Sequence, residues 1–124
     1  MSDEIERLIP RLRRFARAST ADREIADECV ARAIEQLMRE TKTSAASDWL
    51  SDQVRIYRAV ERVLEADSDG SFEKQAWRAL ILVFVEEFSI DEAGRILGVD
   101  RNKVRSMVAV AEKQVKNALS QDHR

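Results

Sequence analysis

Residues 88–105 read FSIDEAGRILGVDRNKVR and contain two helix starts and one helix stop. Ser89 and Glu92 have the spacing of a capping box, in which each side chain pairs with a backbone N–H that a helix start leaves unpaired. Gly98 stands where the end of that helix needs a residue free to adopt a left-handed conformation. Asp100 offers a carboxylate to the next helix N-terminus, whose dipole favours negative charge. The stretch therefore predicts a helix-turn-helix unit.

The composition of the 124 residues is that of a helical globular protein. Charged residues make up 35% and apolar residues 44%, with three glycines and one proline, which favours long amphipathic helices and few turns. The formal net charge of −2 gives no basic character that would indicate nucleic-acid binding. The longest apolar run, Ala79 to Val85, is too short to cross a membrane, and the first residues lack the order of a secretion signal. With Cys29 as the single cysteine, we expect a cytoplasmic protein without an intrachain disulfide.

Apolar residues recurring at intervals of three and four predict an all-α fold. Besides the short helix after Ser89, we expect helices at about 3–18, from the turn at 19–22 to about 41, and at about 48–66, 71–87 and 101–119. Pro10 would either kink the first helix or divide it in two. The last helix is expected to turn one stripe inward, made of Val104, Val108, Ala111, Val115 and Leu119.

Residues 67–70, Asp-Ser-Asp-Gly, are the best candidate for a linker because they are short, acidic and end in glycine. A boundary there gives two small helical lobes, residues 1–66 and 71–124, the second with the helix-turn-helix at 89–118. Neither lobe alone offers much core, so we expect them to pack against each other or against a partner.

The helix expected at about 71–87 carries two apolar stripes, and from Ala79 to Val85 it is apolar on every side. Such a helix is normally buried all round, but a helix-turn-helix can cover only one side of it. The remaining side should meet either the N-terminal lobe or a protein partner that inserts an amphipathic helix. The candidate partner-binding residues are Trp77, Leu80, Ile81, Phe84 and Phe88, together with Val30, Ile34 and Tyr57.

The helix-turn-helix offers an alternative function, DNA binding. Arg101, Asn102, Lys103 and Arg105 would face the major groove, where arginine and asparagine suit guanine and adenine edges. The same residues are also typical of a solvated helix surface. The four arginines between positions 11 and 17 also allow two interpretations. They could bind nucleic acid, or they could form local ion pairs with the acidic second helix.

The sequence contains no constellation typical of an enzyme. It has one histidine, His123, one cysteine on an apolar helix face, no glycine-rich phosphate loop and no metal-ligand spacing. Carboxylates are plentiful, but their helical spacing is typical of solvated faces. We therefore expect no catalysis and no metal, cofactor or small-molecule substrate.

Two segments resemble extracytoplasmic-function sigma factors. Residues 88–105 resemble region 4 of that family, and residues 12–18, LRRFARA, followed by Asp22 and residues 26–28, resemble the start of region 2. Region 2 of a working sigma factor is longer, and a linker of some tens of residues follows it. Here only about 30 residues, 41–70, separate the second helix from the region 4 segment.

This abbreviated form, in which residues 55–63 also lack the promoter-melting pattern, resembles the sigma-factor-like domain of the PhyR family of alphaproteobacterial general-stress-response regulators. The resemblance implies a mimic of the sigma factor EcfG that captures an anti-sigma factor of the NepR type and so releases the true sigma factor, a mechanism called partner switching. It implies a monomer, or a heterodimer with the anti-sigma factor, and no membrane contact.

Two questions stay open at this point. PhyR-family regulators also carry a receiver domain phosphorylated on aspartate, which these 124 residues do not include, so both an excised domain and a stand-alone mimic fit. The alternative function is a DNA-binding regulator or a minimal extracytoplasmic-function sigma factor that uses residues 89–118. For the mimic, a near-neutral charge fits the loss of phosphate contacts, and the double apolar stripe offers a partner helix a place to bind.

Overall fold

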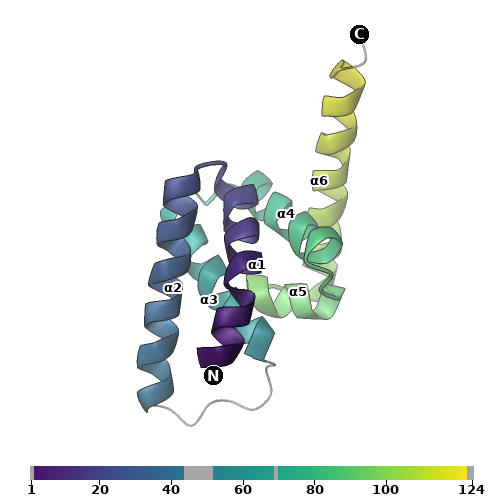
Figure 1. Ribbon diagram of the computed structural model, residues 1–124. Coiled ribbons are helices and arrows are strands. Elements are labelled where there is room, and N and C mark those ends of the chain that lie inside the picture. The colour runs from purple at the N-terminus through teal and green to yellow at the C-terminus, as the bar shows by residue number, and fades with distance from the viewer. Residues whose placement is uncertain (1, 44–51, 69, 123–124) are drawn as a thin grey trace.

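The computed structural model describes residues 2–43, 52–68 and 70–122, and within these ranges the protein is helical without a strand (Figure 1). The predicted all-α fold is confirmed. The elements in chain order are α1 (Ser2–Thr20), α2 (Arg23–Thr43), α3 (Asp52–Asp67), α4 (Phe72–Leu80), the π-helical turn η1 (Ile81–Val85), α5 (Ile90–Leu97) and α6 (Arg101–Asp122).

The N-terminal three helices pack side by side, as their apolar faces require (Figure 1). The alternative in which Pro10 divides the first helix is wrong, because α1 runs through this residue without a break. Pro10 lies on an exposed face, where water can satisfy the carbonyl oxygen that the missing N–H leaves free. The expected start of the third helix near Asp48, with Trp49 and Leu50, lies outside the described residues.

The buried side chains form a hydrophobic cluster that extends from Ile5 in α1 to Ala111 in α6. Helix α3 packs against α5, and α1 packs against α4 and η1, so the helices on either side of residues 67–70 share this core. The division into two lobes stays a prediction. Beyond the core, α6 continues past the other helices toward the C-terminus (Figure 1).

The helix-turn-helix forms as its sequence predicts. Ser89 Oγ accepts a hydrogen bond from the backbone N–H of Glu92 at 3.1 Å, and Glu92 Oε1 accepts one from the N–H of Ser89 at 3.0 Å, which completes the capping box. Gly98 ends α5 in the left-handed conformation, with φ 74°. Asp100 Oδ1 accepts from the N–H of Lys103 at 2.8 Å at the start of α6.

The helix that precedes this unit does not keep the α-helical period to its end. In η1 the N–H of Glu86 donates to the carbonyl oxygen of Ile81, five residues back, at 2.9 Å, and the N–H of Phe88 donates to that of Leu82 at the same distance. Glu87 then has a positive φ of 63°. A π-helical turn adds residues to the turn, so the side chains after it point in directions that a period of 3.6 does not predict.

Candidate functional site

The turn η1 brings apolar side chains to the surface. Phe84 and Val85 are 62% and 50% exposed. In the same apolar run, Ala79, Ile81 and Leu82 are buried in the core. The segment is therefore partly core and partly open apolar surface.

A groove with apolar walls, here called the η1 groove, runs between the α4–η1 segment and α6. Its volume is about 300 Å³, and its lining residues are Leu80, Phe84, Glu112, Val115 and Lys116. Leu119, one turn beyond Val115, is also exposed. The expectation that Leu119 points inward is wrong, because its side chain is 54% exposed. The C-terminal part of α6 extends past the other helices (Figure 1).

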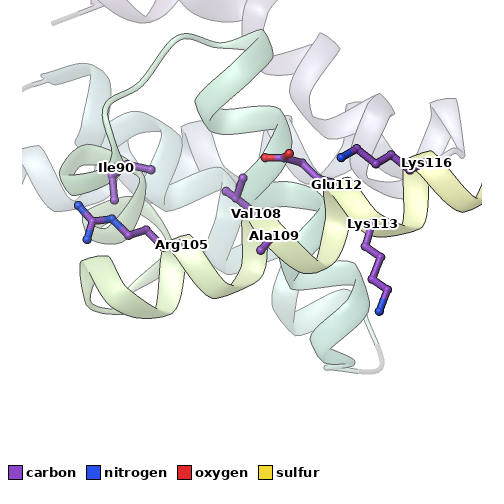
Figure 2. A pocket seen from close by; sticks show the side chains of 7 residues that line it. All are labelled: Ile90, Arg105, Val108, Ala109, Glu112, Lys113 and Lys116. Carbon is purple, nitrogen blue, oxygen red and sulfur yellow. The ribbon is translucent and has the colours of Figure 1, made fainter.

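A second hollow lies on a neighbouring face of α6, and we call it the α6 hollow (Figure 2). Its volume is about 330 Å³. It shares Glu112 and Lys116 with the η1 groove, so the two depressions adjoin along the helix. Its lining residues are Ile90, Arg105, Val108, Ala109, Glu112, Lys113 and Lys116.

A buried carboxylate lies directly after the exposed side chains of η1. Glu86 accepts hydrogen bonds from Arg14 Nε and Nη2, both at 3.0 Å, and from the hydroxyl of Tyr57 at 2.7 Å. Arg11 adds a bond from Nη2 to the backbone carbonyl oxygen of Glu86 at 3.3 Å. This cluster ties α1 and α3 to the end of η1 and fixes the direction in which the turn points its apolar residues.

The ring of Tyr57 completes the cluster. It packs against Phe15 and edge-on against Phe88, with ring centroids 5.6 Å and 4.7 Å apart. Burial, reinforced by the hydrogen bond to Glu86, raises the pKa of the Tyr57 hydroxyl, which therefore stays protonated and serves as a donor.

A second buried cluster joins α4 to α3. The Arg78 guanidinium is almost completely buried and forms ion pairs with Glu61 and Glu65. Burial raises the pKa of Glu61 to about 7, Arg78 acts in the opposite direction, and Glu65 adds to the increase. Nearby, Trp77 Nε1 donates to the carbonyl oxygen of Ala18 at 2.8 Å and so ties α4 to the end of α1.

The side chains predicted to bind a partner do not form one surface. Phe84 is exposed, Leu80 and Trp77 are partly exposed on the α4–η1 segment, and Ile34 is partly exposed on α2. The other four have side chains that are buried in the core and add nothing to an open surface of this chain: Val30, Tyr57, Ile81 and Phe88. Ile81, Phe84 and Phe88 would share one face of the helix expected at about 71–87 only if the α-helical period were unbroken, and η1 interrupts it.

Sequence reasoning missed Glu86 because its partners Arg14 and Tyr57 are 72 and 29 residues away in the chain. It also missed the cations Lys113 and Lys116 on α6. Their signal was present, since they follow Arg105 on the same helix by eight and eleven residues, a spacing that returns to nearby faces.

The residues of the DNA-binding alternative, Arg101, Asn102, Lys103 and Arg105, are exposed at the start of α6. Two of the cations already have partners within the chain. Arg101 Nε lies 3.5 Å from Asp91 Oδ1, and Lys103 Nζ lies 4.9 Å from the centroid of the Phe72 ring. Of the α1 arginines, Arg17 pairs with Asp27 of α2, as the ion-pair interpretation expects.

Among the described residues, no group of three or more histidine, cysteine, aspartate or glutamate side chains is placed to hold a metal ion. Cys29 is a free, buried thiol, and burial raises its pKa. Within the same part of the chain, no helix combines the length and the apolar character needed to span a membrane.

Two family models match the chain. The model of the sigma2 domain of PhyR matches residues 5–66, and the model of the sigma-like domain of the response regulator PhyR matches residues 75–117. The phyllosphere-induced regulator PhyR of Methylorubrum extorquens is 31% identical over an alignment of 122 positions, and the alignment covers 86% of this chain and 46% of that protein.

Two solved structures have the same fold. The anti-anti-sigma factor PhyR of Bartonella quintana, crystallised in complex with the anti-sigma factor NepR, superposes with a TM-score of 0.78 at 24% identity, over 94% of this chain and 50% of that chain. The response regulator PhyR of Brucella abortus superposes with a TM-score of 0.74 at 29% identity, over 92% of this chain and 44% of that chain. The chain thus spans about half the length of these relatives. On the strength of the matches at 5–66 and 75–117, this chain belongs to the PhyR sigma-like domain family.

Proposed function

We propose that this chain is a sigma-factor mimic, which binds an anti-sigma factor of the NepR type and thereby releases the true sigma factor. The observation that carries the proposal is the open apolar surface of Phe84 and Val85 beside the η1 groove, in the region 4-like part of a PhyR sigma-like fold. The Bartonella quintana relative, whose complex contains an anti-sigma factor, supports it.

The exposed side chains of η1 favour a protein partner for energetic reasons. Apolar surface removed from water contributes about 25 cal/mol per Å², so a large aromatic side chain left in solvent is a source of binding free energy. The η1 groove extends this surface to Leu80 and Val115 across two helices. A groove between helices with one exposed aromatic side chain suits the apolar face of an amphipathic helix.

The electrostatics of the helix-turn-helix favour this proposal over DNA binding. Duplex DNA binding depends largely on cations that neutralise phosphates, and the chain has a formal net charge of −2. Asp91 and Glu92 lie in the first turn of α5, and Asp91 already pairs with Arg101. Carboxylates at these positions would repel a phosphate backbone.

Calorimetric titration with the NepR-type anti-sigma factor from the same genome tests the proposal. We expect a dissociation constant in the nanomolar range, as a rough magnitude for a specific interface of ordinary size. Phe84→Asp should weaken binding by about 100-fold, because a charge would replace an aromatic side chain at the centre of the contact.

Ile25→Asp is the matched control, since Ile25 is an exposed apolar residue on α2, away from the η1 groove. This variant should bind as the wild-type chain does. If the wild-type chain does not bind the anti-sigma factor, or if Phe84→Asp leaves the affinity unchanged, the proposal is refuted.

A further inference from the structure

The α6 hollow combines an apolar floor with an excess of positive charge. Ile90, Val108 and Ala109 form the floor, in which Val108 belongs to the hydrophobic core, Ile90 packs against that core and Ala109 is exposed. Three of the lining residues are cations and one, Glu112, is a carboxylate. In a chain with a formal net charge of −2, this is a local excess of positive charge.

The cations lie at the two ends of the hollow. Figure 2 shows Arg105 beside Ile90 at one end, and Lys113 and Lys116 at the other. Arg105 and Lys113 are eight residues apart on one helix, which at 1.5 Å per residue places their Cα atoms about 12 Å apart. Both are exposed.

This spacing determines what chemistry the hollow would recognise. A second α-helix lying along α6 repeats its own positions about every seven or eight residues, again close to 12 Å. Carboxylates at two such positions, on the edge of an apolar stripe, would reach Arg105 and Lys113 while the stripe covers Ile90, Val108 and Ala109. A phosphate backbone would satisfy the cations but not the apolar floor.

We propose that the α6 hollow binds an amphipathic helix of the anti-sigma factor whose apolar stripe is flanked by carboxylates two turns apart. The inference rests on the proposed function and adds the charge pattern of the partner and a second contact. The shared residues Glu112 and Lys116 make the hollow continuous with the η1 groove, so one partner can occupy both. Phe84 in the η1 groove provides the aromatic contact, and Arg105 and Lys113 in the hollow fix the position of the partner helix along α6.

The test is a double charge reversal, Arg105→Glu with Lys113→Glu, titrated against the same anti-sigma factor. We expect the affinity to fall by about tenfold at low salt and the loss to shrink as salt is raised, since exposed charges are screened. The matched control combines Arg23→Glu on α2 with Arg62→Glu on α3 and leaves Arg105 and Lys113 intact. It changes the net charge by the same amount. The control should lose much less than tenfold.

Replacing the two matching carboxylates of the partner helix with lysine should restore the affinity of the Arg105→Glu, Lys113→Glu variant. If the double reversal binds as the wild-type chain does, or if the control loses as much, the inference is overturned while the proposed function stands. If the wild-type chain does not bind at all, both fall.

Sedimentation of the chain alone provides a further check. A stable dimer that the double reversal dissociates would show that a second copy occupies the hollow, and this result would also overturn the inference.

Discussion

The helix-turn-helix and the turn η1 are neighbours in the chain, yet they distribute polar and apolar side chains in opposite ways. In α5 the apolar residues Ala93, Ile96 and Leu97 are buried and the charged residues face water. In and just after η1, Phe84 and Val85 face water and Glu86 is buried. The first region is arranged as folding alone would require. The second exposes apolar side chains next in sequence to a buried carboxylate, which folding alone does not require, and this difference supports the proposal that η1 contacts a partner.

Replacing the buried carboxylate of Glu86 should remove the difference between the two regions. We expect it to have the largest effect on the free energy of unfolding. Glu86→Gln removes the charge that Arg14 and Tyr57 bind while it keeps the shape of the side chain. We expect a loss of about 2–3 kcal/mol in the free energy of unfolding, toward the low end because the Arg14 side chain is half exposed. Urea denaturation measures it.

The neighbouring residue provides the control for this variant. Glu87 is exposed and accepts the same change, so Glu87→Gln should stay within about 0.5 kcal/mol of the wild-type chain. Equal losses from the two variants would contradict the role assigned to Glu86.

Substitutions at two glycines of the helix-turn-helix test the effects of close packing and of backbone conformation separately. A Cβ at Gly94 would lie 2.7 Å from the backbone carbonyl oxygen of Val99, whereas a Cβ at Gly98 would meet nothing within 4 Å. Gly94→Ala should therefore cost about 2 kcal/mol by overpacking a turn that cannot yield. Gly98→Ala should cost about 1 kcal/mol, because only its left-handed φ of 74° is unfavourable. Thermal unfolding of both variants gives the order, and the reverse order would show that the turn does yield.

The buried cluster under α4 should make stability depend on pH. In the folded chain burial raises the pKa of Glu61 to about 7 from its ordinary 4.5, so between these values the folded state holds a proton that the unfolded state has lost. The contribution of Glu61 to stability is therefore largest below about pH 4.5 and declines as the pH rises through about 7.

Comparing the wild-type chain with Glu61→Gln isolates this contribution, because other titrating groups are common to both. From about pH 5 to about pH 8 the wild-type chain should lose about 2 kcal/mol relative to the variant in urea denaturation. A difference in stability that is constant across this range would show that Arg78 holds Glu61 ionised throughout.

The extent to which the fold could be predicted follows from the range of the interactions. The capping box, the left-handed Gly98 and the Asp100 cap depend on residues within a few positions of one another, and the structure confirms each. The direction of η1 depends on Arg14 and Tyr57, which are distant in sequence, so local periodicity could not reveal it.

At the candidate site, too, features that depend on nearby residues could be predicted and features that depend on the three-dimensional structure could not. The exposure of Phe84 could be anticipated, because an apolar run on every side of a helix exceeds what so small a protein can cover. The burial of Ile81 and Phe88 could not, because the π-helical hydrogen bonds after Leu80 shift the helical phase. The basic positions of α6 were visible in sequence, but only the concave surface beside Ile90 shows which of them act together.

The smallest expected effect concerns the surface of the helix-turn-helix. Lys103→Ala removes a cation from the Phe72 ring and should cost about 0.5 kcal/mol, the usual value of an exposed contact of this kind. Together with Arg101→Ala it should leave the affinity for the anti-sigma factor unchanged, since neither residue lines the η1 groove or the α6 hollow. Calorimetry of the double variant measures this. A loss comparable to that of Phe84→Asp would mean that the partner also contacts the first turn of α6, outside the η1 groove and the α6 hollow.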